Sequence, residues 1–217
     1  MARPRSDLER AGAALDEYGI LLLSDAKLPS VASIVAGEPV RGSWWGHPKG
    51  HAIFNTSEAL EERADVTVAK LVSGKVTYIH QRLWPALVAV GQSRGPWQLG
   101  GLGPPARRIL DEVERSGAAR TDALAVALKM TGKEVAKAAL DLEKRLLVHA
   151  AEVHTQSGAH AKALETWMRW LKRAKLTSRA LSASEGMRAI ERAVAKVNGE
   201  FGGNAVLRWQ SRVKFRP

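Results

Sequence analysis

Residues 104–130 read PPARRILDEVERSGAARTDALAVALKM, and residues 131–167 read TGKEVAKAALDLEKRLLVHAAEVHTQSGAHAKALETW. The first part predicts two helices. Ile109, Leu110 and Val113 lie on one side of the first helix, which follows two prolines that suit a helix start. Thr121 is expected to cap a short second helix that ends near Met130.

The second part predicts a longer helix and a β-hairpin. Thr131 and Glu134 form a capping-box pattern that opens a third helix, which continues to Leu146. Residues 146–154 and 160–167 flank a Ser-Gly turn and predict the two strands of the hairpin. The second of these runs is ambiguous, because Ala, Leu, Lys and Glu favour a helix when judged alone.

An earlier stretch, residues 28–82, repeats the order of helix, helix and hairpin. Its clearest element is the hairpin at residues 65–80, whose β-branched and aromatic residues favour strands. The turn between those strands carries Gly74 where a positive φ is needed. A further amphipathic helix is predicted at residues 4–18.

In element order and capping, residues 104–167 resemble the winged-helix superfamily, in the form shared by bacterial regulators of the multiple-antibiotic-resistance type. The resemblance implies a helix-turn-helix whose third helix enters a DNA major groove or packs against protein. A chain of two such modules is also similar in outline to the bacterial alkylpurine DNA glycosylases, which implies base-repair chemistry. The catalytic signature associated with those enzymes, a glutamine two residues before another glutamine or an aspartate, is missing, so no catalytic residue carries over: Gln81, Gln92, Gln98, Gln156 and Gln210 stand alone.

The expected fold class is α+β, mostly α, with tandem winged-helix-like modules, short β-hairpin wings and a basic C-terminal helical extension. The glycine-rich residues 94–103 are typical of a linker. We therefore expect an N-terminal module at residues 1–99, a second module at 104–167 and the basic extension at 168–217.

The positive charge is concentrated near the C-terminus. The chain has 217 residues and a formal net charge of +11. Residues 1–103 hold 11 basic and 10 acidic residues, residues 104–159 hold 9 and 8, and residues 160–217 hold 13 and 4. This density indicates a polyanion partner, most often nucleic acid, because each neutralised phosphate releases counterions. The alternative is that a basic surface only keeps the protein soluble.

Candidate DNA contacts follow from this charge and from the predicted winged helix. On the third helix, Glu134, Asp141 and Glu143 oppose binding to phosphate, and the lysines favour it. We expect the tail cations to form one continuous surface with the wing. The predicted contacts are Lys133, Lys137 and Lys144 on the helix, His154 and His160 beside the wing, and Arg169, Lys172, Arg173, Lys175 and Arg179 along the tail.

Residues 42–51, GSWWGHPKGH, form the densest local signature. Trp44 and Trp45 are candidates for stacking on unpaired or flipped bases, because aromatic rings stack on every base. The alternative is that both pack under the following helix. His47 and His51 are four apart, but the intervening proline and glycine disfavour the continuous helix that a metal pair would need. No metal site is predicted.

Several function classes lack their signatures. The chain has no Cys, which excludes disulfides, thiolate catalysis and Cys-based zinc sites. Phosphate-binding loops, dinucleotide fingerprints, nucleophile elbows and HExxH are missing, and no cofactor is expected. No apolar run approaches the ~20 residues of a membrane helix, and the N-terminus lacks a signal peptide, so a cytoplasmic location without membrane contact is expected.

Taken together, the sequence predicts a bacterial double-stranded DNA-binding protein that does no chemistry on DNA, either a regulator or a DNA-repair accessory. One alternative is a glycosylase-like repair enzyme that uses the Trp44–His51 segment around a flipped base. Another is a protein-assembly module, with a homodimer interface through the first and last helices.

Overall fold

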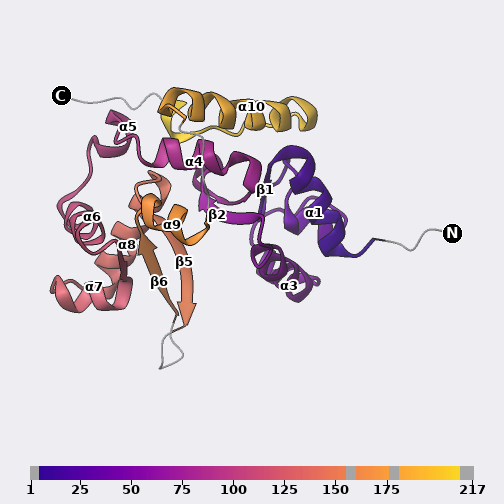
Figure 1. The fold of residues 1–217 in the computed structure, drawn as a ribbon. Helices are drawn as coiled ribbons and strands as arrows, with labels where there is room; N and C mark the ends of the chain where they lie inside the picture. Colours follow the sequence, from indigo (N-terminus) through magenta and orange to yellow (C-terminus); the bar gives the residue numbers. More distant parts are fainter. Residues whose placement is uncertain (1–4, 155–159, 176–180, 211–217) are drawn as a thin grey trace. The chain divides into compact units, whose positions relative to one another are not determined.

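A computed structural model of the protein describes residues 5–154, 160–175 and 181–210 (Figure 1). Over these residues the chain is mostly helical and has two antiparallel three-stranded sheets, which confirms the α+β fold class. The described residues form two compact units, one of residues 5–84 and 187–210, the other of residues 85–154, 160–175 and 181–186. Within these residues, every helix is too short or too polar to span a bilayer.

The first unit places helices against a small sheet. Its central strand, β3, pairs antiparallel with both neighbours, so that Ile20 lies opposite Ile79 and Val68 opposite Tyr78. Leu15, Ile53 and other apolar side chains fill the core beneath it. The elements are α1 (Asp7–Tyr18), β1 (Ile20–Leu22), α2 (Val31–Ala36), α3 (Gly50–Glu61), β2 (Val66–Lys70), β3 (Val76–His80) and most of α10 (Ala183–Phe201).

The second unit has the same arrangement. Here β6 is the central strand, with Leu164 opposite Ala119 of β4 and Ala150 of β5. Ile109, Val113 and Leu142 are buried in its core. Its elements are nearly all of α4 (Trp84–Gly91), α5 (Pro96–Leu99), α6 (Pro104–Ser116), β4 (Ala118–Arg120), α7 (Thr121–Ala127), α8 (Gly132–Lys144), β5 (His149–His154), β6 (His160–Glu165), α9 (Trp167–Arg173) and the start of α10.

Counted from α1 in the first unit and from α6 in the second, both units therefore run helix, strand, helix, helix, strand, strand, with the last strand in the middle of the sheet. The sequence predicts the helices and hairpins of this order, including the turn glycine Gly74, whose φ is +68°. The two short strands β1 and β4 were not predicted, because three residues are too few to show an alternating pattern.

The ambiguous run at residues 160–167 is a strand followed by the start of a helix, and the predicted hairpin is confirmed. The predicted N-cap of α7 is wrong. Arg120 occupies the cap position, and the hydroxyl of Thr121 instead accepts a hydrogen bond from the backbone N–H of Lys162 at 3.0 Å. That bond ties the start of α7 to the central strand.

The interpretation of residues 94–103 as a linker is wrong for the part around α5. Gln98 is fully buried; its side-chain oxygen accepts from Ser93 and Gly95, and its amide donates to the carbonyl of Arg145 at 3.1 Å. This segment is thereby fixed within the second unit. The predicted domain ranges, 1–99, 104–167 and 168–217, differ from the boundaries of the two compact units. That those ranges fold independently stays a prediction.

Candidate nucleic-acid interface

The start of α8 is held by two sets of contacts. The N–H of Glu134 donates to the hydroxyl of Thr131 at 3.2 Å, and the N–H of Thr131 donates to the Glu134 carboxylate at 2.8 Å, which confirms the predicted capping box. In the preceding turn, the carbonyl of Leu128 accepts from Arg108 of α6 at 2.7 Å. The cap and the arginine together fix where α8 begins.

The outer side of α8 carries three predicted DNA contacts, Lys133, Lys137 and Lys144, named here the α8 lysine stripe. At about 100° per residue these positions fall within an arc of about 40°. Lys133 and Lys137 are exposed and Lys144 is half-buried, while Val135 and Leu142 face the core. None of the three lysines forms an ion pair within the part of the chain that the structure describes.

The carboxylates of α8 are engaged elsewhere. Glu134 is used in the cap, where the hydrogen bonds from Thr131 lower its pKa. Asp141 accepts from the Arg145 guanidinium at 2.9 Å, and the buried Glu143 accepts from the Lys162 ammonium at 2.6 Å. The acidic side chains expected to oppose phosphate thus have intramolecular partners.

The end of α8 is anchored by Arg145, whose side chain is 9% exposed. Its guanidinium also donates to the carbonyls of Gln98 and Gly100, at 2.8 and 2.7 Å. Because a buried guanidinium needs partners for its N–H groups, these carbonyls and Asp141 hold it in one position. The helix that presents the lysines is therefore fixed at both ends.

The hairpin that follows α8 pairs His154 with His160 at its last described register position. The side chains of these two predicted contacts, and the Ser-Gly loop between them, lie outside the described residues. Trp167 and Trp170 of α9 are buried, and the indole N–H of Trp167 donates to the carbonyl of Leu146 at 2.7 Å. This bond joins α9 to the end of α8.

A buried carboxylate lies between the hairpin and α9. Glu165 accepts from the Arg173 guanidinium at 2.6 Å, and the Nδ1 of His149 lies 3.2 Å from the same carboxylate. Burial raises the pKa of Glu165, but the hydrogen bonds from His149 and Arg173 outweigh it and lower the pKa to about 2. Arg173 still leaves 60% of its side chain exposed.

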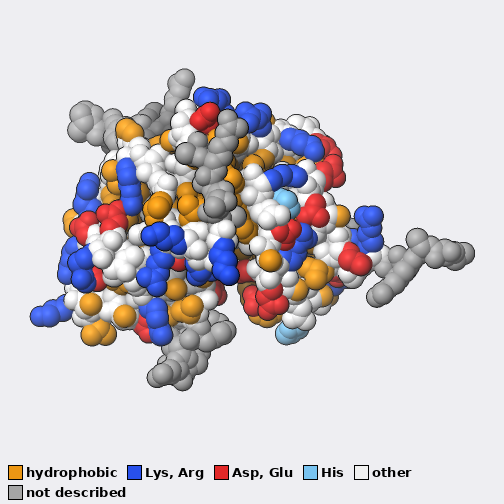
Figure 2. All heavy atoms as spheres, viewed as in Figure 1, with side chains coloured by type: hydrophobic (Ala, Val, Ile, Leu, Met, Phe, Trp, Pro, Cys, Tyr) orange, Lys and Arg blue, Asp and Glu red, His pale blue; other side chains and the backbone are white. Residues whose placement is uncertain are grey.

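Three further predicted contacts, Arg169, Lys172 and Lys175, are exposed on α9 and just after it. Figure 2 shows lysine and arginine side chains gathering over the region of α9 and the hairpin, with few acidic ones. Arg179 falls outside the described residues. The other described tail cations, Arg188, Arg192, Lys196 and Arg208, belong to the first unit, so a single continuous tail surface stays a prediction.

Trp44 and Trp45 form a 3₁₀ turn before α3, in the first unit. Their rings stack with centroids 4.2 Å apart, and Phe54 lies 5.5 Å from Trp45. Trp44 packs against the core, but Trp45 is 61% exposed. Packing under the helix, the alternative to base stacking, therefore holds for Trp44 and is wrong for Trp45.

His47 and His51 do not join a group of metal ligands among the described residues. The Nδ1 of His47 accepts from the backbone N–H of Lys49 at 3.1 Å. Three ligand-type atoms within 4.8 Å of one another occur elsewhere, on Asp16, Asp65 and His80.

The group of Asp16, Asp65 and His80 already holds a cation. One Nη atom of Arg63 lies 2.9 Å from the Asp16 carboxylate and 2.7 Å from that of Asp65, and its hydrogen bonds lower the pKa of Asp65. The guanidinium thus supplies the positive charge that the carboxylates need, and the group is an ion-pair network.

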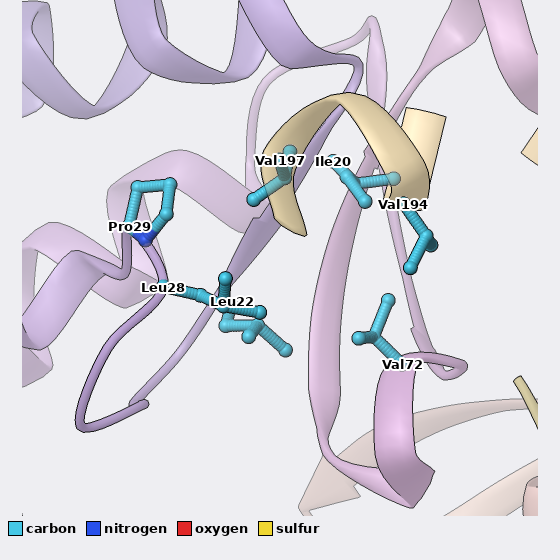
Figure 3. A pocket seen from close by; sticks show the side chains of 7 residues that line it. All are labelled: Ile20, Leu22, Leu28, Pro29, Val72, Val194 and Val197. Atoms are coloured by element: carbon cyan, nitrogen blue, oxygen red, sulfur yellow. The ribbon is translucent and has the colours of Figure 1, made fainter. Parts of the chain in front are cut away.

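A small pocket lies in the first unit (Figure 3); its cavity volume is about 10 Å³, far below the ~300–1,000 Å³ of ligand sites. All of its lining side chains are apolar, so they offer no hydrogen bond to the edge of a base. The lining residues are Ile20, Leu22, Leu28, Pro29, Val72, Val194 and Val197.

Comparison with known proteins gives one match. No curated protein and no solved structure matches the chain. A family model described as AlkZ related matches residues 6–207, which include both units. AlkZ is associated with DNA repair, and this match points to a DNA-related role. By this match over nearly its whole length, the chain belongs to the AlkZ-related family.

Proposed function

We propose that the protein binds double-stranded DNA through the α8 lysine stripe in a DNA-repair role. The observation that carries the proposal is the arrangement of α8: three lysines share one outer arc, and each carboxylate of the helix has its own intramolecular partner. Membership of the AlkZ-related family supports DNA as the polyanion.

The repeated element order supports a winged-helix interpretation of both units, with α8 as the helix that enters the major groove, ~12 Å wide. Lys133 and Lys137 lie in its N-terminal half, where such helices meet base edges and phosphates. Val126 of α7, 81% exposed, supplies an apolar contact of the kind that suits a thymine methyl group. Sequence reasoning missed Val126, although its position two residues after the buried Leu124 places it on the opposite side of α7.

The α9 cations extend the contact in this proposal. Arg169, Lys172 and Lys175 would bind backbone phosphates beside the groove, because they are exposed and none of them pairs with a carboxylate among the described residues. Contacts by Arg173, Arg179, His154 and His160 stay predictions, as do a homodimer, a bacterial origin and a cytoplasmic location.

The proposal is tested by titrating a labelled duplex with the K133Q/K137Q/K144Q variant and following fluorescence anisotropy at low salt. Removal of each lysine charge should weaken binding, and the triple variant should bind at least tenfold more weakly. The matched control is R10Q/R115Q/R120Q, which removes the same charge from exposed arginines that already pair with Asp7, Glu112 and Asp122. An equal loss of duplex affinity in the two variants would contradict the proposal.

A second candidate function, base repair, is favoured by the exposed Trp45 ring, which lies against Trp44 and Phe54. Such a surface could stack a flipped base. Incubation with alkylated duplexes should then release free base, and Trp45→Ala should abolish the release without changing binding to undamaged DNA. If the protein binds a panel of damaged duplexes tightly and releases no base from any of them, base repair is contradicted and DNA binding without catalysis is the function that stands.

A further inference from the structure

The third helices of the two units present opposite charges. On α8, the outer side carries lysines. The corresponding helix of the first unit, α3, contains neither Lys nor Arg, and its exposed side chains include Phe54, Glu58 and Glu61, followed by Glu62 at its end. A phosphate backbone against this side would face carboxylates, so α3 does not suit the role given to α8.

The first unit has a different cationic side, on α10. Arg188, Arg192 and Lys196 are four residues apart and exposed, and at about 100° per residue they fall within an arc of about 80°. We name them the α10 stripe. Ile190, together with Val194 and Val197 shown in Figure 3, is buried on the opposite side and holds the helix on the unit.

The carboxylates of α10 within the first unit have partners. Glu191 accepts from the indole N–H of Trp209 at 2.8 Å, and Glu200 accepts from the Tyr18 hydroxyl at 2.7 Å. That hydrogen bond raises the pKa of Tyr18 to about 12, so the phenol remains a donor at neutral pH. As on α8, the acidic side chains are occupied within the protein.

The stripe itself is held weakly by its surroundings. Lys196 lies 3.8 Å from the Glu17 carboxylate, with both side chains at least half exposed, and 4.9 Å from the centre of the Tyr18 ring. An exposed ion pair at this distance is worth little and is easily replaced. For Arg188 and Arg192, the described residues include no carboxylate within ion-pair distance.

We infer that the first unit contacts DNA phosphates through the α10 stripe and not through its third helix. The three cations span about 12 Å along the helix, at about 1.5 Å per residue. That length matches several phosphates of one strand, which rise about 3.4 Å each along the duplex axis. The inference rests on the proposed function, and it adds that the units, despite their common element order, use different helices.

The lack of cysteine in the chain allows a direct test of which helix lies next to DNA. Single-cysteine variants carrying a thiol-linked photo-crosslinker are made at Ala195 of α10, Asn55 of α3 and Ala136 of α8, all exposed positions that leave the cations in place. Irradiation with a duplex should crosslink A195C and A136C and give several-fold less product with N55C.

The other outcomes separate the two proposals. Crosslinking of A136C without A195C overturns the α10 stripe and keeps the proposed function. Failure of all three, with no binding by the unmodified protein, overturns both. Crosslinking of N55C as efficient as that of A195C would show that α3 faces DNA after all.

Charge neutralisation gives a second readout. Log affinity for DNA falls as log salt concentration rises. In R188Q/R192Q/K196Q this fall should be less steep, by about one unit of slope for each phosphate that the variant no longer neutralises. R188K/R192K/K196R, which keeps the charge, should restore the slope, and R10Q/R115Q/R120Q should leave it near that of the natural protein. A slope that stays the same in the glutamine variant contradicts the inference.

Discussion

At the scale of single residues, Gly91 is a position where a methyl group has no room. A Cβ there would lie 2.3 Å from the indole nitrogen of Trp167, and that ring is fixed by its bond to Leu146. Gly91→Ala should therefore lower the free energy of unfolding by about 1–3 kcal/mol, as overpacked cores do. Urea titration followed by tryptophan fluorescence measures the change.

Gly132, at the start of α8, provides the matched control, since a Cβ at this position would meet nothing within 4 Å. Gly132→Ala should leave stability unchanged or raise it by up to about 1 kcal/mol, because alanine costs less backbone entropy in a helix. An equal decrease in the free energy of unfolding of the two variants would contradict the close packing of Trp167 against α4.

Glu165 should make stability depend on acid pH. Its pKa is about 2 in the folded protein against an ordinary 4.5, so the stability it adds is present above pH 4.5 and lost as the pH falls toward 2. At neutral pH the free energy of unfolding of the natural protein should exceed that of Glu165→Gln by on the order of 3 kcal/mol. This difference should shrink as the pH falls from 4.5 toward 2. A gap that stays constant down to pH 2 would contradict the pairing with His149 and Arg173.

Residues whose role depends on near neighbours in the chain were predicted best. Thr131 and Glu134 are three apart, and their capping box follows from that spacing alone. Thr121 and Gln98 were misinterpreted because their partners, Lys162 and Arg145, are more than 40 residues away. The α10 stripe left a signal, Arg or Lys at every fourth residue, which was interpreted only as part of a basic tail.

At the scale of elements, α9 depends on its N-cap. The hydroxyl of Thr166 accepts from the backbone N–H of Arg169 at 3.3 Å. Thr166→Ala should lower stability by about 1 kcal/mol, and Thr166→Ser should recover most of it, because serine keeps the acceptor. A shift of the urea midpoint with unchanged slope is the expected result, and an alanine variant as stable as the natural protein would show that the cap is unimportant.

Among the strands that the sequence predicts, β6 has the weakest local preference for a strand. Its residues His160–Glu165 are Ala, Lys, Leu and Glu besides the histidine, and they favour a helix. They form the central strand because β4 and β5 bond to both edges and Leu164 enters the core. Such tertiary pairing overrides the local preference of β6 for a helix. In β2 and β3, on either side of Gly74, the β-branched residues themselves favour a strand.

At the scale of the whole chain, two units of the same element order carry different surfaces. The α8 lysine stripe and the α9 cations belong to the second unit, while the α10 stripe and the acidic α3 belong to the first. Net charge along the sequence predicted the polyanion partner but not this division, because residues 160–217 supply cations to both units.

The central claim is that the α8 lysine stripe contacts DNA phosphates. The most direct test compares the salt dependence of duplex affinity, from about 50 to 200 mM salt, for the natural protein, K133Q/K137Q/K144Q and R10Q/R115Q/R120Q. The α8 variant should lose up to about three units of log–log slope, and the control variant should lose almost none. Identical slopes for all three proteins would contradict the claim.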